Sequence, residues 1–138
     1  MKMYVSEIMT TGIVAEEPQS TAEHAAEMMS EHNIGALPVT QSREIVGIVT
    51  DRDIVLRCLA KGLDPKKTTV GDIMSRCAVC ISPHHTIDDV VHIMSREQIR
   101  RLPVADNGNL VGMISMADIA RIRHGLEAAV AISEISRP

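Results

Sequence analysis

The sequence predicts an α/β (α+β) fold of two β-α-β-β-α repeats packed about a pseudo-twofold axis. First, the chain aligns with itself at an offset of 65 residues: positions 5–54 and 70–119 share 16 identical residues out of 50, where unrelated segments would share about 3. Second, each half contains an apolar stripe of helical period followed by two short β-branched runs. Third, one copy of about 55 residues would bury too little surface alone, so the copies are expected to share one core.

The offset also sets the expected domain boundaries. Residues 1–62 form the first repeat, 63–69 a linker, 70–124 the second repeat and 125–138 a C-terminal extension. The extension is too apolar between Leu126 and Ile135 to be a free tail. We therefore expect it to pack on the body of the protein or on a second chain.

The first helix of each repeat is predicted from an amphipathic stripe. A capping box is expected at its start, formed by Ser20 and Glu23 in the first copy and by Thr86 and Asp89 in the second. The apolar positions follow i, i+3, i+4, i+7 spacing. They are Ala22, Ala25, Ala26 and Met29 in one copy, and Ile87, Val90, Val91 and Met94 in the other.

Strands are predicted on both sides of that helix. A short first strand ends before Pro18 or Pro83, because the residue preceding a proline is restricted. After the helix, two runs read as a hairpin around the polar turn 41–44, whose counterpart is 106–109. These runs are Leu37–Val39 and Ile45–Thr50. A second helix is expected from Asp51 to Gly62, a residue suited to ending a helix.

The composition argues against several function classes. The chain has no Trp, no Phe and one Tyr, and its net charge is −4. A surface that stacks bases or binds a phosphate backbone needs aromatic side chains and clustered cations, so no nucleic acid is expected. No apolar run reaches the length of a membrane span, and the three Cys make a poor disulfide framework. We expect a cytoplasmic protein that does not contact a membrane.

The segments 47–53 and 112–118 carry the most informative motif. Each is a glycine-containing strand that enters a helix through Ser/Thr-x-x-Asp, with Thr50 and Asp53 in one copy and Ser115 and Asp118 in the other. The simpler interpretation is a capping box. The functional interpretation is that a hydroxyl at the helix start binds phosphate while the Asp accepts hydrogen bonds from a ribose diol.

Both halves resemble CBS (cystathionine-β-synthase) domains, and the pair resembles a stand-alone tandem CBS protein. The resemblance covers residues 5–60 and 70–124 and is carried by three motif pairs: IMT/IMS, IGALPV/IRRLPV and GIVTDRDI/GMISMADI. It implies the β-α-β-β-α fold and a regulatory sensor that binds AMP, ADP, ATP or another adenosyl ligand in clefts between the repeats. It also implies a homodimer, an effector protein of unknown identity, and no catalysis.

The resemblance implies two unequal ligand sites. Ser115 and Asp118 would contact phosphate and ribose in one cleft, and Thr50 and Asp53 in the other. Before the LPV strand the copies differ: Gly35-Ala36 in the first, Arg100-Arg101 in the second. Two arginines make the better polyphosphate site, whereas the first cleft offers only Arg52, next to Asp51. The first strand of the opposite copy would hold adenine: Thr11, Gly12, Ile13 and Val14 at the Ser115 site, and Cys77, Ala78, Val79 and Cys80 at the other.

Three alternatives compete with nucleotide sensing. A zinc site at Cys77, Cys80, His84 and His85 is disfavoured because the two Cys align with Gly12 and Ala15 on a strand, where residues three apart face opposite sides. No metal and no catalytic cofactor are therefore expected. No catalytic triad, nucleotide-cradling lysine loop or carboxylate pair appears, so no enzyme is expected. A ligand-free dimeric interaction or stress-response protein remains the other hypothesis.

Overall fold

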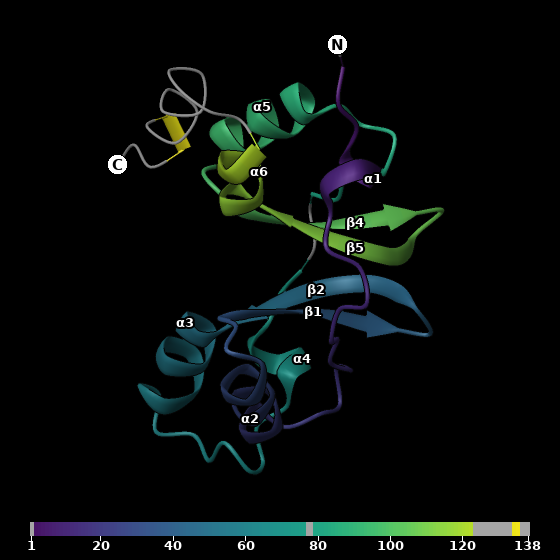
Figure 1. The fold of residues 1–138 in the computed structure, drawn as a ribbon. Helices are drawn as coiled ribbons and strands as arrows, with labels where there is room; N and C mark the ends of the chain where they lie inside the picture. The colour runs from purple at the N-terminus through teal and green to yellow at the C-terminus, as the bar shows by residue number, and fades with distance from the viewer. Residues whose placement is uncertain (1, 77–78, 123–133, 136–138) are drawn as a thin grey trace. The chain divides into compact units, whose positions relative to one another are not determined.

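The computed structural model describes residues 2–76, 79–122 and 134–135. The chain forms two compact units, which do not coincide with the two repeats of the sequence (Figure 1). Unit 1 combines Met1–Ile13 with Val79–Pro138, and unit 2 is the continuous segment Val14–Ala78. The beginning of each repeat thus belongs to the unit that contains the rest of the other repeat.

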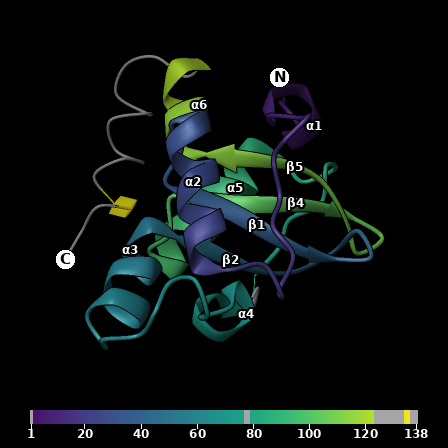
Figure 2. The ribbon, with the colours of Figure 1, turned by 90° about the horizontal axis from the view of Figure 1, so that it is seen from below.

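Unit 2 is a small antiparallel sheet covered by helices. Strand β1 (Ala36–Gln41) pairs with β2 (Glu44–Thr50), which also pairs with the short β3 (Ser75–Arg76). The helices α2 (Ala22–His32), α3 (Asp51–Asp53) and α4 (Val70–Ile73) lie on the same side of the β1–β2 hairpin, and α2 crosses it in the view from below (Figure 2). A π-helical segment, η1 (Ile54–Leu59), continues α3.

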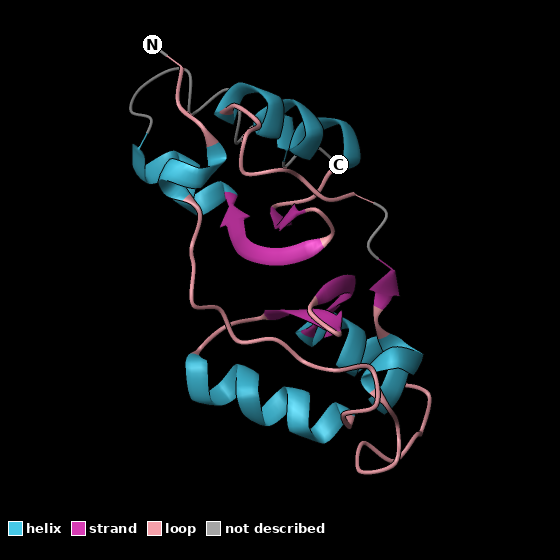
Figure 3. Cartoon of the chain, turned by 90° about the vertical axis from the view of Figure 1, so that its right-hand side faces the viewer, coloured by secondary structure: helices cyan, strands magenta, loops and turns pink. Residues whose placement is uncertain are grey.

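Unit 1 repeats this arrangement. Strand β4 (Arg101–Asp106) pairs antiparallel with β5 (Asn109–Ser115). Its helices are α1 (Val5–Ile8), α5 (Ile87–Glu97) and α6 (Met116–Ile122). Figure 3 shows a layer of strands and a layer of helices in each unit. The mixed helix–strand class predicted from the sequence is confirmed.

The predicted first strands are reduced to single bridged residues. Glu16 bridges Val39 in parallel, and Ile81 bridges Val104 in the same way. Each makes two backbone hydrogen bonds; for Glu16 they are its N–H to Pro38 O at 2.9 Å and Thr40 N–H to its carbonyl at 2.8 Å. Pro18 and Pro83 follow two residues later, as expected for a strand that stops there.

One predicted helix cap is wrong by one residue. Thr21, and not Ser20, caps α2, and its side chain accepts from the N–H of His24 and not of Glu23. Thr21 is the repeat equivalent of Thr86, which caps α5 in the predicted reciprocal box with Asp89. There the Thr86 backbone N–H, followed by its hydroxyl, holds the pKa of Asp89 below its usual value.

Backbone hydrogen bonds explain why the repeats exchange their first segments. The first N–H groups of a helix have no partner within the helix. In α2 they donate to the linker, with Ala22 N–H to Thr68 O at 2.8 Å; in α5, Ile87 N–H donates to Met3 O at 2.9 Å. The predicted linker 63–69 is therefore packed on unit 2 and is not a free tether.

The two units have separate aliphatic cores. Unit 2 buries Leu37, Val39 and Val49 together with Cys58. Unit 1 buries a larger set: Val5, Ile81, Ile87, Val90, Met94, Leu102, Val104, Ile114, Met116, Ile119 and Ile135. Two details differ from expectation: Ala26 is exposed and Val91 only half-buried, because the contact face of each helix is narrower than the sequence stripe.

The C-terminal extension contacts unit 1 at its described residues. Ile135 is buried in the core of that unit. The carbonyl of Glu134 accepts a hydrogen bond from Gln98 Nε2 at 3.0 Å. This agrees with the expectation of packing on the body, while the predicted apolar positions Ala128, Ala129, Val130 and Ile132 lie outside the described residues.

Candidate ligand site in unit 1 and its counterpart in unit 2

Ser115 and Asp118 form a reciprocal capping box at the start of α6. Ser115 N–H donates to Asp118 Oδ2 at 3.0 Å, and Asp118 N–H donates to Ser115 Oγ at 3.1 Å. The interpretation of this motif as a capping box is therefore correct. It leaves the Ser115 hydroxyl hydrogen and the second carboxylate oxygen of Asp118 outside the box.

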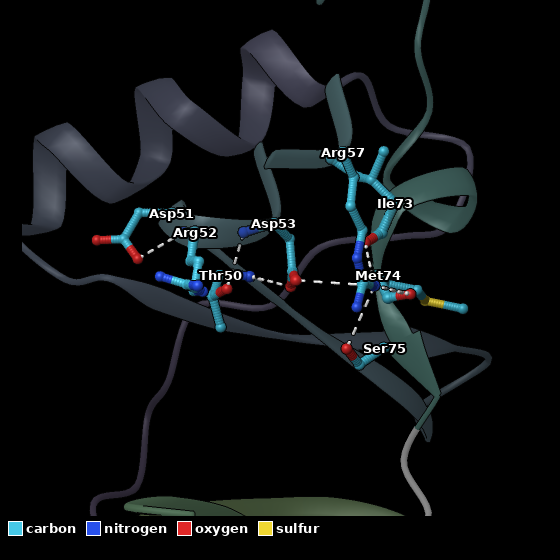
Figure 4. A network of polar contacts seen from close by, with 8 residues as sticks. All are labelled: Thr50, Asp51, Arg52, Asp53, Arg57, Ile73, Met74 and Ser75. Atoms are coloured by element: carbon cyan, nitrogen blue, oxygen red, sulfur yellow. Dashed lines mark hydrogen bonds and ion pairs between the residues drawn. The ribbon is translucent and has the colours of Figure 1, made fainter. Parts of the chain in front are cut away.

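The motif of unit 2 has the same geometry, seen close up in Figure 4. Thr50 N–H donates to Asp53 Oδ2 at 2.9 Å, and Asp53 N–H donates to Thr50 Oγ1 at 3.1 Å. Asp51 turns its carboxylate back onto the N–H of Arg52 at 2.8 Å. Arg52 itself is exposed. The two units thus present the same hydroxyl and carboxylate from the same strand–helix junction.

An arginine approaches the remaining oxygen of each motif carboxylate. In unit 1, Arg121 Nη2 donates to Asp118 Oδ1. In unit 2, Arg57 Nη1 lies 3.7 Å from Asp53 Oδ1 and also donates to the carbonyls of Ile73 at 3.0 Å and Met74 at 3.3 Å. Sequence reasoning missed both arginines, although their spacing of three or four residues from the Asp is visible in the sequence.

The residues before the LPV strands lie beside these motifs. Arg100 accepts the N–H of Met116 on its carbonyl at 2.8 Å, and Arg101 is the register partner of Ser115. The first copy makes the same bond from Asp51 N–H to Gly35 O at 2.9 Å and pairs Ala36 with Thr50.

The copies differ at this position and at the first residue of the following helix. A Cβ at Gly35 would lie 3.0 Å from Asp51 Oδ2. The second copy has Met116 in place of Asp51, and it carries Arg100 in place of Gly35.

The predicted adenine segment is placed next to the Ser115 motif. Thr10 and Met113 exchange two backbone hydrogen bonds, of 2.8 and 3.0 Å, which fixes the start of the segment on β5 two residues before Ser115. Thr11 and Gly12 are exposed and Ile13 is half-buried, all within unit 1. Val14 begins unit 2.

The corresponding segment for the Thr50 motif is described only in part. Cys77 and Ala78 lie outside the described residues. Val79 and Cys80 belong to unit 1, whereas Thr50 and Asp53 belong to unit 2. Of the two predicted sites, the one at Ser115 is therefore the one whose described parts, apart from Val14, share a unit.

Comparison with known proteins decides the family. The chain matches the CBS domain twice, over residues 5–59 and 70–125. It is 40% identical over 116 residues to the CBS domain-containing protein YhcV of Bacillus subtilis (strain 168), covering 84% of this chain and 82% of YhcV. The chain belongs to the CBS family.

Two solved CBS structures are similar to this chain. The crystal structure of Hypoxic Response Protein I with two coordinated zinc ions has a TM-score of 0.82 at 36% identity, covering 88% of this chain and all of that one. The CBS domain pair of protein MJ0100, in complex with 5-methylthioadenosine and S-adenosyl-L-methionine, has a TM-score of 0.79 at 28% identity, covering 88% and 96%.

The Cys and His residues of the second CBS repeat do not form a metal cluster where they are described. Cys80 is exposed, and His85 Nδ1 accepts the N–H of Ser82 at 2.8 Å. Within residues 2–76, 79–122 and 134–135, no three His, Cys, Asp or Glu side chains converge as metal ligands would. Cys77 falls outside these ranges, so the absence of metal stays a prediction.

The first CBS repeat contains a buried carboxylate that the sequence analysis overlooked. Glu16 is 2% exposed, and its Oε1 lies 2.8 Å from Nδ1 of His24. The repeat offset carried the signal: Glu16 aligns with Ile81, a core residue, and His24 aligns with the cap partner Asp89. The Glu16–His24 pair of the first repeat therefore stands where the second repeat has the core residue Ile81 and the cap partner Asp89.

Proposed function

We propose that this CBS pair is a regulatory module that binds an adenine nucleotide (AMP, ADP or ATP) at Ser115 and Asp118, and that it catalyses no reaction. The observation that supports this most directly is the convergence on β5. The strand ends at the Ser115–Asp118 motif, pairs with Arg101 of β4 at that residue, and carries Thr10 two residues earlier. Hydroxyl, carboxylate, guanidinium and exposed backbone thus lie around one strand end.

Each group has a distinct role in this proposal. Arg101, with Arg100 beside it, pairs with phosphate, since guanidinium binds phosphate oxygens bidentately. Asp118 accepts the ribose hydroxyls, and Ser115 donates to phosphate. Backbone groups and small side chains of Thr11, Gly12 and Ile13, with Val14 following, hold the adenine. The adenosyl ligands of the MJ0100 structure support this ligand class.

The Thr50–Asp53 motif is the weaker site in this proposal. It has Ala36 where the other copy has Arg101, and the carboxylate of Asp51 would repel a phosphate. Its cation is Arg52, and its adenine contacts would include Val79 and Cys80. We expect nucleotide binding to depend mainly on the second copy.

Calorimetric titration with AMP, ADP, ATP, NAD and S-adenosylmethionine tests the proposal. We expect saturable binding of at least one of them, weakened about 10- to 100-fold by Arg101→Ala or Asp118→Asn, since each removes a charge-assisted hydrogen bond. Asp118→Asn is preferred to alanine because an amide oxygen keeps the cap on Ser115 N–H. Arg43→Ala, an exposed charge in the β1–β2 turn, is the control. No binding of any ligand at millimolar concentration would refute nucleotide sensing.

An exposed apolar face supports a homodimer. Along η1 and just beyond it, four large apolar side chains are 43–53% exposed: Val55, Leu56, Leu59 and Leu63. Contiguous apolar surface of this kind marks interaction sites. We propose that it pairs with a second copy, and that the dimer works in the cytoplasm with an effector protein. None of the described helices is long and apolar enough to cross a membrane.

Dimerisation gives a separate prediction. Leu59→Glu is expected to shift the mass measured by light scattering after size-exclusion chromatography from dimer to monomer, because a charge cannot be buried there without a partner. Gln41→Glu makes the same charge change at an exposed strand end and is expected to leave the dimer intact. A monomeric wild type would contradict the proposal. A dimer that binds no nucleotide would favour the ligand-free interaction protein.

A further inference from the structure

We propose that Arg121 guards the ribose-binding carboxylate of Asp118 and is displaced when ligand binds, whereas Arg57, which approaches Asp53 in unit 2, is fixed there. The chain therefore takes one adenosyl ligand, and takes it at Asp118. This inference rests on the proposed function and adds to it a specific competitor, a stoichiometry and a cause for the difference between the two motifs.

Each carboxylate oxygen of Asp118 already accepts one hydrogen bond before any ligand arrives. Its Oδ2 accepts from Ser115 N–H, and its Oδ1 accepts from the guanidinium of Arg121. The Asp118 side chain is only 12% exposed, whereas that of Arg121 is 69% exposed. A ribose diol that donates to Oδ1 meets the guanidinium already bonded to that oxygen, and we infer that ligand and arginine compete for the space beside it.

Arg121 can leave at little cost. Among the residues that the structure describes, Arg121 contacts the carboxylate of Asp118, three residues earlier on the same helix, through an ion pair in which the arginine side chain is exposed. A pair with one solvent-exposed partner is weak, because water competes for the guanidinium and the long side chain loses entropy in forming it. Once released, the guanidinium can pair with the phosphate of a nucleotide. Adenosine has no phosphate, so it provides no new partner for the released guanidinium.

Arg57 cannot leave in the same way. Besides its 3.7 Å approach to Asp53, its Nη1 donates to two backbone carbonyls and lies 3.4 Å from Ser75 Oγ (Figure 4). These contacts tie η1 to the end of α4 and the start of β3. Displacing Arg57 would leave the carbonyls of Ile73 and Met74 without that donor, at a cost that ribose binding does not return. The carboxylate of Asp53 is therefore paired permanently with Arg57, whereas the carboxylate of Asp118 is paired reversibly with Arg121.

The test compares Arg121→Ala with wild type, using adenosine and AMP as probes in calorimetric titrations. Adenosine is expected to bind about two- to fivefold more tightly to Arg121→Ala, since one exposed ion pair no longer competes. The gain for AMP is expected to be smaller, because the variant also loses a partner for phosphate. Both proteins are expected to bind one ligand per chain.

Salt provides a readout that a merely structural role would not change. Screening weakens the Arg121–Asp118 pair, so added salt should tighten adenosine binding to wild type and leave Arg121→Ala unaffected. The control is Arg96→Ala on α5, which removes another exposed arginine with a neighbouring carboxylate, Glu97, in the same unit. It is expected to behave as wild type.

The outcomes separate this inference from the proposed function. If wild type binds a ligand and Arg121→Ala binds adenosine equally or more weakly, the guard is refuted and nucleotide sensing stands. Two ligands bound per wild-type chain would refute the assignment of Arg57 as fixed. If neither wild type nor Arg121→Ala binds adenosine or AMP at millimolar concentration, the proposed function fails and the guard fails with it.

Discussion

Gly47→Ala is expected to lower the free energy of unfolding by about 3 kcal/mol, the upper end of the range for overpacking. A Cβ at this position would lie 2.6 Å from the backbone oxygen of Ser75 and 2.7 Å from Met74 Sδ. Ser75 is held in β3 as the register partner of Ile48. The backbone oxygen therefore cannot withdraw without breaking the β2–β3 pairing. Urea unfolding followed by circular dichroism measures the loss.

The duplicated fold supplies a second copy of this test and a control. Gly112 is the repeat equivalent of Gly47, and its Cβ would lie 2.9 Å from Thr10 O, so Gly112→Ala should destabilise in the same direction. Gly108→Ala meets no atom within 4 Å but has a φ of +84°, which costs about 1 kcal/mol through backbone strain alone. Equal losses for Gly47→Ala and Gly108→Ala would contradict the close-approach argument.

His24→Ala is expected to lower the free energy of unfolding by about 1–3 kcal/mol, because it leaves the Glu16 carboxylate buried without its histidine. A fully buried pair would lose more on breakage, but the His24 side chain is 54% exposed, so water reaches this end of the pair. In contrast, Glu16→Ile installs the residue of the other copy, Ile81. It is expected to be neutral or stabilising, since well-packed apolar residues commonly replace buried ion pairs without loss.

A double-mutant cycle separates these effects. In the Glu16→Ile background, His24→Ala should cost almost nothing, because there is no carboxylate left to satisfy. Glu16→Gln keeps the shape and a hydrogen-bonding oxygen without the charge, and it serves as the matched control. If His24→Ala destabilises both backgrounds equally, the histidine stabilises α2 by another route and the pairing with Glu16 is not what matters.

Much of the fold could be predicted because the sequence contains each element twice. The stripes of both first helices, the hairpins and the helix end at Gly62 all follow from local spacing. The offset would also have corrected the cap, since Thr21 aligns with the cap residue Thr86 and Ser20 aligns with His85. Local chemistry and an internal alignment were sufficient for these features.

Other features depend on contacts that no local pattern encodes. That Met3 O receives the N–H of Ile87, and Thr68 O that of Ala22, is set by where distant segments meet. Arg57 follows Asp53 by four residues and Arg121 follows Asp118 by three, a spacing that is visible in the sequence, but the π-helical form of η1 has no sequence signal of its own. At the candidate site the hydroxyl and carboxylate were predicted, and the competing arginines were not.

The exchange of first segments also constrains the order in which the protein can be made. Unit 2 is one uninterrupted stretch, 14–78, so every residue it needs has been synthesised before the second hairpin exists. In unit 1, by contrast, Met3 and Thr10 cannot form their native hydrogen bonds until Ile87 and Met113 have left the ribosome, because Ile87 is the partner of Met3 and Met113 is the partner of Thr10. Since domains generally fold as they emerge, the nascent chain completes its middle first and joins its two ends last.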